Sequence, residues 1–506
     1  MGNNINDLYN PDPNNENYSN LRKEQEAFKE SLHPSSASEE INLDQLPIEE
    51  ITDFNLSNVV KINSENYQDV YETSQLINKL LHFICENIVG REEVVRQTFY
   101  AFLTGEHQLI LGRTGMAKSL LARQIFECFE DTNLFEKQLT KDTMPDNLFG
   151  AYDMEEMKRG KMIHNIQGSI VISDFAFLDE IFDANDMLLR SLLSLLNERQ
   201  LINGEQIVDS PLNSVIAASN YIRATEMLEA VLDRFIYKSY IPENKNLYYQ
   251  FSIDQIYGQN IGKVKCPEDK LKVENLKVLK KVIKSQIIRI PEFILFLKNY
   301  ILRQYIDETK KIENSYNFTI SDRTTAKVQD LLRASAVLDG RSVVEEKDLD
   351  SLFYLISMVG KEDEKERLKG IIDTTKRYFH QDKELLQKIF NLINIFRTIK
   401  SAKDPKSLVE HQNFILIVSK IEQSFVEQSI KNRLKKFIEK MGFRPNKSRL
   451  TNVLEIFQES CSLLKDMGTK KETLELIEGF EQDIDLFNEV TLRHSFYNSR
   501  SNILPA

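Results

Sequence analysis

The stretch Leu109–Ala122, LILGRTGMAKSLLA, decides the predicted fold. An apolar run leads into a glycine-containing turn, and a helical pattern begins directly after the turn. In this context the backbone N–H groups of the turn and of the helix amino terminus would cradle phosphates, Lys118 would bring charge to the β- and γ-phosphates, and Ser119 would bind Mg²⁺. The strict phosphate-loop pattern has Gly before the Lys, where this chain has Ala117. Taken alone, the stretch also fits a strand, a turn and a helix with a surface lysine.

Two adjacent acids, Asp179 and Glu180, follow the apolar run FAFL. At the carboxyl end of a strand, Asp179 would hold Mg²⁺ through its water shell, and Glu180 would polarise the water that attacks the γ-phosphate. Asp and Glu also begin many helices, so a helix cap is the alternative for this pair alone.

Three further polar residues stand in an order that suits the same site. Asn220 follows the run SVIAAS, where its amide could orient the lytic water, and Arg234 in LEAVLDRF and Arg323 in SDRTTAKV could neutralise transition-state charge. Each also has a plainer interpretation, because Asn commonly forms turns and a surface arginine usually pairs with an acid. Their order beside the phosphate loop and the acids favours one composite site.

Short β-type runs alternate with helical runs through the first half of the chain. HQLILG, LFEKQL, IVISDFAFLDE, SVIAAS and FIYKSYI alternate with SLLARQIFECFE and MLLRSLLSLLNE, which predicts an α/β fold with a parallel sheet covered by helices. Helical spacing on both sides of Val89–Gly90 predicts two helices before the sheet, and EFILFLKNYILRQYIDE and TTAKVQDLLRASAVL are amphipathic. The predicted domains are a disordered polar arm (1–65), an α/β nucleotide-binding domain (66–242), a helical lid domain (243–360) and a C-terminal all-helical module (361–506).

Size and charge narrow the class of protein. A chain of 506 residues exceeds the usual size of one hydrophobic core, so two or three domains are expected. The 65 Lys and Arg residues against 77 Asp and Glu residues give a net charge of -12, which counts against a nucleic-acid partner. The start of the chain shows no targeting signal, and the apolar stretches are too short for membrane insertion. These features predict a cytoplasmic protein.

The ordered motifs NIVGREEVVRQ, GRTGMAKS, LFG, FAFLDEIF, LLSLLNERQLINGEQ, VIAASNY, LEAVLDRF and SDRTTAKVQDLLRASAVLDGR resemble the MoxR family of AAA+ P-loop ATPases. The resemblance covers roughly residues 75–360 and is nearest to the RavA branch, which is similar to this sequence in placing Ala before the Lys. Arg113 and Thr114 stand where the family commonly has two prolines, which removes no phosphate-binding group. The resemblance implies a homo-hexameric ring with ATP and Mg²⁺ at subunit interfaces.

The same resemblance assigns roles by position. It places Val89 and Gly90 beside the adenine, makes Asp179 and Glu180 the Walker B pair, and makes Asn220 the sensor 1 residue. Arg234 would be the arginine finger that reaches the ATP of a neighbouring subunit, and Arg323 would be the sensor 2 arginine of the lid, completing the site of its own chain. Arg199 in LLNERQ could line the central surface of the ring or could end a solvated helix. The predicted phosphate loop comprises Gly112, Arg113, Thr114, Gly115, Met116, Ala117, Lys118, Ser119 and Leu120.

Three functions fit these motifs. The resemblance implies ATP hydrolysis that drives chaperone-like remodelling or activation of a partner protein carrying a von Willebrand factor A domain, supplied as a separate chain. A nucleic-acid motor related to replicative helicases is the second, and the acidic balance counts against it. An ATP-gated scaffold without turnover is the third, and the presence of Glu180 argues against it. The client protein and the role of the C-terminal module are left open by the sequence.

Overall fold

The structure is a computed structural model. It divides into two compact units. It describes residues 67–221, 231, 233–241, 246–260, 264–285, 287–311, 320–355, 362–402, 405, 409, 412–425, 428–441, 449–468 and 470–500. The larger unit is built from Asn55–Phe390 and Leu464–Ile477, and the described part of the smaller unit comes from Asn391–Leu463 and from Glu478 onward. The polar arm predicted for residues 1–65 lies outside the described residues.

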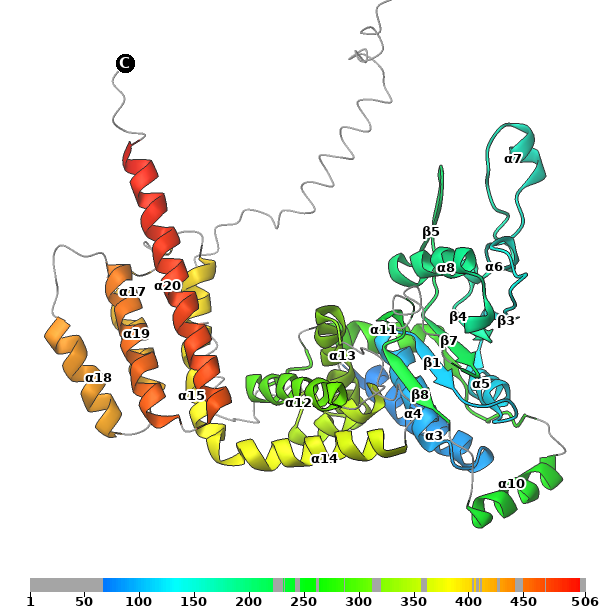
Figure 1. The fold of residues 1–506 in the computed structure, drawn as a ribbon, viewed down its shortest axis with the longest axis horizontal. Coiled ribbons are helices and arrows are strands. Elements are labelled where there is room, and N and C mark those ends of the chain that lie inside the picture. Colours follow the sequence, from blue (N-terminus) through cyan, green and yellow to red (C-terminus); the bar gives the residue numbers. More distant parts are fainter. Residues whose placement is uncertain are drawn as a thin grey trace, which may run out of the picture. The chain divides into compact units, whose positions relative to one another are not determined.

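A five-stranded parallel sheet forms the centre of the larger unit (Figure 1). Its strand order is β3-β4-β7-β1-β8, and the inner strands β1 and β7 are buried along their whole length, which explains their continuous apolar runs. The predicted α/β fold is confirmed. The strands are β1 (Gln108–Leu111), β3 (Leu134–Gln138), β4 (Phe175–Asp179), β7 (Ser214–Ser219) and β8 (Tyr237–Tyr240).

The helices around the sheet also follow the predicted pattern. The two predicted helices before the sheet are present as α3 (Gln68–Asn87) and α4 (Glu92–Thr104), and the buried faces of both carry apolar residues at helical spacing. α5 (Lys118–Phe126) follows the phosphate-loop sequence, and α8 (Asp186–Glu198) begins at Asn185, whose side chain caps the Leu188 N–H. Two short helices, α6 (Asp146–Phe149) and α7 (Met154–Lys158), lie between β3 and β4.

Local structure departs from the sequence pattern in three places. The run IVIS forms a 3₁₀ turn, Ile170–Ile172, which the Ser169 side chain caps, so β4 begins only at Phe175. An antiparallel hairpin of β5 (Gln200–Asn203) and β6 (Gln206–Asp209) follows α8, and β2 (Phe129–Glu130) pairs with β9 (Leu271–Lys272). Pairs this short leave little periodic signal in a sequence.

The helices after the sheet form the lid region of the larger unit. They are α10 (Leu247–Asn260), α11 (Val273–Lys284), α12 (Glu292–Lys310), α13 (Asp322–Leu338), the 3₁₀ segment η7 (Glu346–Leu355) and α14 (Glu362–Phe379). Arg341, which follows α13 and is half-buried, pairs at 2.7 Å with the buried Asp348 of η7. α14 packs on α12 and belongs to the larger unit, beyond the domain boundary predicted at residue 360.

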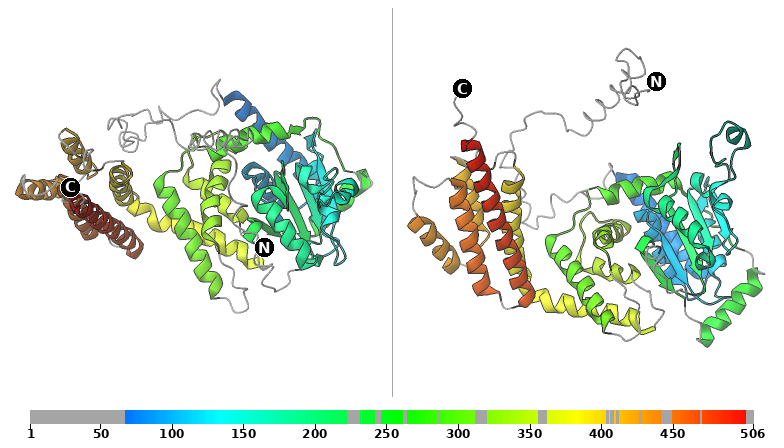
Figure 2. Two further views of the ribbon diagram at one scale, coloured as in Figure 1. Left: turned by 90° about the horizontal axis from the view of Figure 1, so that it is seen from above. Right: turned by 45° about the horizontal axis from the view of Figure 1, so that its top comes forward.

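The smaller unit is a bundle of helices, as Figures 1 and 2 show. Phe396 lies at its centre and contacts Phe457, Phe480 and Phe487 at ring-centroid distances of 5.6 to 5.7 Å. No helix in the described part of the chain has the length and apolar character needed to cross a membrane. The helices of this region are α15 (Lys383–Ser401), α17 (Gln412–Gln423), α18 (Gln428–Met441), α19 (Arg449–Met467) and α20 (Lys471–Arg500), the first and last two of which also reach into the larger unit.

Candidate nucleotide site

The candidate site lies at the carboxyl edge of the parallel sheet, where three neighbouring strands end. The phosphate-loop sequence follows β1, Asp179 ends β4, and Asn220 follows β7, and these strands are adjacent in the order β4-β7-β1. Ligands of open α/β sheets bind beyond the carboxyl ends of the strands. The sheet topology therefore brings together side chains that are far apart in the sequence.

The backbone of the loop explains which positions favour glycine. A Cβ atom at Gly112 would lie 3.1 Å from the Cβ of Ile241 and 3.2 Å from its carbonyl oxygen. Gly115 has a φ of 84°, and Ala117, the residue before α5, has a φ of 60°. A left-handed residue other than Gly costs about 1 kcal/mol, which accounts for Gly in the strict pattern. Alanine has the smallest side chain that can take this conformation, so the loop keeps its shape at a modest cost.

Lys118 is buried and already directed into the site. Its side chain is 7% exposed, and its ammonium donates hydrogen bonds of 2.5 Å to the carbonyl oxygen of Gly112 and 2.5 Å to the amide oxygen of Asn220. Burial lowers the pKa of Lys118, while the nearby carboxylates of Glu180 and Asp179 oppose that shift. The lysine is therefore part of a polar cluster, and its plainer interpretation as a surface residue is wrong.

Ser119 and Asp179 provide oxygen ligands that suit a magnesium ion. The Ser119 hydroxyl donates a hydrogen bond of 3.0 Å to the Asp179 carboxylate. The described residues contain no group of three or more His, Cys, Asp or Glu side chains that could hold a metal by themselves. Mg²⁺ commonly binds through one or two protein oxygens together with phosphate oxygens and water, so these two side chains fit that ion in the presence of a nucleotide.

Glu180 is held in an unusual backbone conformation next to the cluster. Its φ is 54° and its ψ is 47°, in the left-handed region that a long side chain rarely adopts. The backbone N–H of Asn220 donates to the Glu180 carboxylate at 3.3 Å, and the Asn220 amide nitrogen donates to its other oxygen. Burial is the largest influence on this group and raises the pKa of Glu180, which suits a general base. Glu180 precedes the 3₁₀ turn Ile181–Asp183, but its side chain makes no capping hydrogen bond, so the helix-cap alternative is not supported for Glu180.

Arg234 lies at the opposite edge of the sheet from the loop of its own chain. β1 and β8 are parallel, with Gln108 aligned with Tyr237, so a residue just before β8 lies at the amino edge. Arg234 donates a hydrogen bond of 2.8 Å to Asp233, and its Nε atom is buried without a hydrogen-bond partner. This position cannot serve the phosphate loop of the same chain.

Arg323 also lies at the amino edge. In the first turn of α13 it donates a hydrogen bond of 3.2 Å to Asn197, and Lys327, one turn further on, pairs at 2.8 Å with Glu106, which lies just before β1. The structure thus does not bring Arg323 to the loop of its own chain. The expectation that it completes the site within one subunit is not met, because α13 docks at the other end of β1.

The remaining predicted residues are placed as follows. Val89 and Gly90 form the turn between α3 and α4, where Gly90 has a φ of 68°, and their proximity to an adenine stays a prediction. Met116 is half-buried and closes a backbone hydrogen bond of 3.3 Å to the carbonyl oxygen of Arg113. Arg113, Thr114 and Leu120 are exposed.

Arg199 has a role that the sequence did not reveal. The residue ends α8 with a φ of 54°, and its guanidinium lies 2.6 Å from a ring nitrogen of His107 and donates at 2.7 Å to the carbonyl oxygen of Gly105. Burial lowers the pKa of Arg199 to about 10 and that of His107 well below its usual range. The position of Arg199 fits neither of the two predicted alternatives, a pore-lining arginine or the solvated end of a helix. Because its partners are mainly backbone carbonyls and one histidine, no sequence pattern signals the contact.

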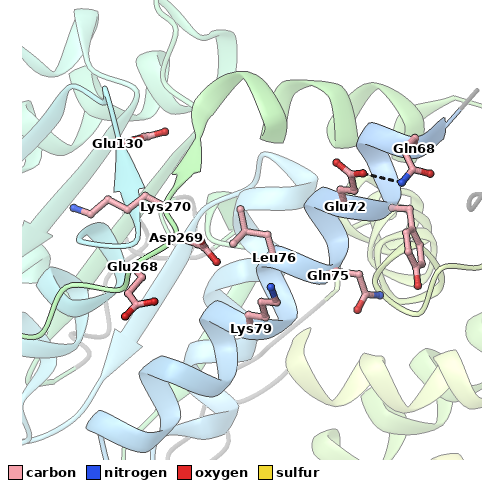
Figure 3. Close-up of a pocket in the computed structure, with 10 residues that line it drawn as sticks. Gln68, Glu72, Gln75, Leu76, Lys79, Glu130, Glu268, Asp269 and Lys270 are labelled. Atoms are coloured by element: carbon pink, nitrogen blue, oxygen red, sulfur yellow. Dashed lines mark hydrogen bonds between the residues drawn. The ribbon is translucent and has the colours of Figure 1, made fainter. Parts of the chain in front are cut away.

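A separate hollow of about 580 Å³ lies beside α3. Figure 3 shows side chains from α3 facing the segment that leads into β9. Four of the residues that line it are acidic, namely Glu72, Glu130, Glu268 and Asp269. Carboxylates repel phosphates, so this hollow does not suit a nucleotide.

Two segments of the larger unit match known protein families. Residues 75–255 match the family model described as the MoxR domain in the MoxR-vWA-beta-propeller ternary systems, and residues 290–372 match the AAA lid domain. The two matches support a MoxR-family AAA+ ATPase, in keeping with the parallel sheet and the helices that follow it.

Individual proteins that are similar to this chain share between 19% and 29% sequence identity with it. Two uncharacterized proteins of Methanocaldococcus jannaschii are 29% and 27% identical over 361 and 370 residues, which are 69% and 71% of this chain and 88% and 92% of those proteins. A structural protein of Acidianus two-tailed virus is 26% identical over 168 residues, 32% of this chain and 27% of its own length. A solved structure of a proposed ATPase from Cytophaga hutchinsonii is similar over 61% of this chain and 96% of its own, with 19% identity and a TM-score of 0.48.

Proposed function

We propose that the chain hydrolyses ATP with Mg²⁺ and uses the energy to remodel or activate a partner protein. One observation carries the hydrolytic part: the side chain of Asn220 joins Lys118 to Glu180 in a single hydrogen-bonded cluster. Lys118 and the loop N–H groups would bind the β- and γ-phosphates. Ser119 and Asp179 would hold Mg²⁺, which would offset the charge of the phosphates.

The chemical step rests on Glu180 and Asn220. With its raised pKa, the Glu180 carboxylate would accept a proton from the attacking water, and the Asn220 amide would keep that carboxylate in position. Release of inorganic phosphate from ATP by the purified chain, with and without chelation of Mg²⁺, tests this proposal. Phosphate release that is absent, or that is unchanged by the chelator, would contradict it.

The positions of the two arginines support an assembly in which subunits share sites. Arg234 and Arg323 lie at the edge of the sheet opposite their own loop, so each would act on nucleotide bound by an adjacent subunit. A closed homo-hexameric ring gives every site such a neighbour. Mass determination by light scattering, with and without a non-hydrolysable ATP analogue, tests for the hexamer. A monomer under both conditions would contradict it.

The proposed partner is a separate protein with a von Willebrand factor A domain, and the proposed effect on it is chaperone-like. The description of the matching family model, which names MoxR-vWA systems, supports this choice. A Glu180→Gln chain loaded with ATP should retain such a partner, because turnover is blocked while the bound state persists. Affinity capture with this variant, followed by binding assays with the purified candidate, tests the proposal. Equal binding with and without ATP would contradict the proposal that ATP controls binding of the partner.

The RavA-like branch and the cytoplasmic location stay predictions.

A further inference from the structure

The residue that follows Asn220 contacts the segment that follows Glu180. Tyr221 comes directly after Asn220, and its hydroxyl donates a hydrogen bond to the carboxylate of Asp183. Asp183 is the last residue of the 3₁₀ turn η6 (Ile181–Asp183), which begins directly after Glu180. β4 and β7 are neighbouring strands (Figure 1), so this hydrogen bond joins the segments beyond their carboxyl ends.

The backbone of Tyr221 is fixed by Ser219, the last residue of β7. The buried hydroxyl of Ser219 donates a hydrogen bond of 3.0 Å to the carbonyl oxygen of Tyr221. The carbonyl oxygen of Ser219 accepts a hydrogen bond of 3.1 Å from the N–H of Gly112, the first residue of the phosphate-loop sequence. Tyr221 is therefore connected to the phosphate loop through one buried residue.

The backbone of Glu180 depends on its neighbours for its conformation. A long side chain in the left-handed region is strained, and such a conformation persists where surrounding contacts hold it. The N–H of Glu180 donates a hydrogen bond of 3.0 Å to the Asp179 carboxylate, and its carbonyl oxygen accepts one of 2.9 Å from the N–H of Asp183. Asp183 thus holds the backbone of Glu180 from the side of the turn.

The turn is held at its middle by the core and at its end by Tyr221. Ile181 and Phe182 are buried at 0% and 2% exposure, which fixes the middle of the turn. Asp183 is only half-buried, and its carboxylate accepts the hydrogen bond from the Tyr221 hydroxyl. This hydrogen bond therefore completes the attachment of the turn at its more exposed end.

The plainer interpretation of Tyr221 is a surface tyrosine, because its side chain is 41% exposed and an exposed hydrogen bond contributes little to stability. Its position in the chain argues for more than that. Asn220 holds the carboxylate of Glu180, and the next residue, Tyr221, holds the turn that accommodates the backbone of Glu180. Two consecutive residues thus hold one side chain from two directions.

We infer that Tyr221 is a positioning residue for Glu180 and acts through Asp183. Its hydroxyl keeps the turn in place, so that the Glu180 carboxylate stays against Asn220. A misplacement of about 1 Å can cost on the order of 100-fold in rate, so the loss of one of several holding contacts should cost about tenfold. This inference rests on the proposed ATP hydrolysis and adds to it a residue that does not touch the nucleotide.

Steady-state kinetics with measured ATP affinity tests this role. Tyr221→Phe and Asp183→Ala should each lower kcat by about tenfold and leave the affinity for ATP within about twofold. The double variant should also lose about tenfold, because both changes remove the same contact. Tyr257→Phe, a change at an exposed tyrosine of α10, is the matched control and should leave kcat unchanged.

Two results of these measurements would overturn the inference. The first is an unchanged kcat in the Tyr221→Phe chain. The second is a lowered affinity for ATP at unchanged kcat, which would show that Tyr221 contacts the nucleotide.

A chain without the base separates positioning from a general structural role. When Tyr221→Phe is added to Glu180→Gln, the single-turnover rate should fall no further than in Glu180→Gln alone, because the group that Tyr221 positions is already lost. A further tenfold loss in the double variant would overturn the inference, since Tyr221 would then act on another part of the site.

Hydrogen exchange tests the holding contact without any hydrolysis. The N–H groups of Asp183 and Ala184 close the turn, and Tyr221→Phe should raise their exchange rates by about tenfold, as measured by mass spectrometry with electron-transfer fragmentation. Tyr257→Phe should leave these rates unchanged. Unchanged exchange in the Tyr221→Phe chain would overturn the inference. An unaltered chain that releases no phosphate would instead overturn the proposed hydrolysis, and the exchange rates would still decide whether Tyr221 holds the turn.

Discussion

Asn220 donates two hydrogen bonds to the Glu180 carboxylate, one from its backbone N–H at 3.3 Å and one from its side-chain amide. The oxygen of the same amide accepts a hydrogen bond from Lys118. The orientation of the amide is thus fixed from both sides, and a left-handed backbone directs Glu180 toward it. Such mutual support is expected of a site built to hold a base in place.

Lys118→Ala should weaken ATP binding by about 10- to 100-fold, since a charge-assisted hydrogen bond contributes roughly 1.5–3 kcal/mol. Fluorescence titration with a labelled ATP analogue measures the effect. Lys141→Ala is the matched control, because Lys141 is exposed and its removal should leave binding unchanged. Equal affinity in the Lys118→Ala chain and the unaltered chain would remove the lysine from the site.

The pH dependence of turnover should reflect the raised pKa of Glu180. A base acts when ionised, so turnover should fall with decreasing pH at a value above the ordinary 4.5 of this group. Because the pKa of Glu180 is raised, the folded chain binds this proton more tightly than the unfolded chain does. The ionised carboxylate therefore lowers the free energy of unfolding at neutral pH, and this effect disappears below pH 4.5. Glu180→Gln should therefore raise the unfolding temperature at neutral pH and lose that advantage in acid. A turnover profile flat down to 4.5 would contradict this assignment.

Arg234→Ala should reduce turnover by about 10³-fold if the side chain acts as an arginine finger. Mixing it with a Glu180→Gln chain should restore part of the activity, because a mixed interface can combine an intact Glu180 with an intact Arg234. Mixed assemblies must first be verified by native mass spectrometry. Verified mixtures without any recovery would exclude sharing of the site between subunits.

Arg323→Ala should reduce turnover by about 10²-fold if Arg323 contacts nucleotide in an adjacent subunit. Asn197→Ala provides the control, because it removes the one hydrogen-bond partner described for Arg323 in its own chain while leaving the guanidinium intact. The two variants should differ strongly in turnover at similar stability. Equal effects would show that Arg323 serves only to tie α13 to α8.

The sequence predicted the sheet and the core of the site because their signals are local. The apolar runs of β1, β4 and β7 are buried strands, and the polar residue at each carboxyl end follows directly from strand direction. Lys118, Asp179 and Asn220 could therefore be assigned to one site from the order of residues along the chain.

The location of Arg323 could not be predicted in the same way. It depends on how α13 docks, which is set by long-range contacts such as the ion pair between Lys327 and Glu106. The contact of Arg199 with His107 and the short β5–β6 pairing are likewise products of tertiary packing. Neither leaves a periodic pattern in the sequence.

Single-turnover and steady-state ATP hydrolysis by the Glu180→Gln chain, measured beside its affinity for ATP, tests the central assignment most directly. Loss of the base should lower the hydrolysis rate by about 10²- to 10⁴-fold, while the loop, Lys118 and Ser119 keep the affinity within about threefold of the unaltered chain. A Glu180→Gln chain that binds ATP and hydrolyses it at the unaltered rate would contradict the assignment of Glu180 as the base.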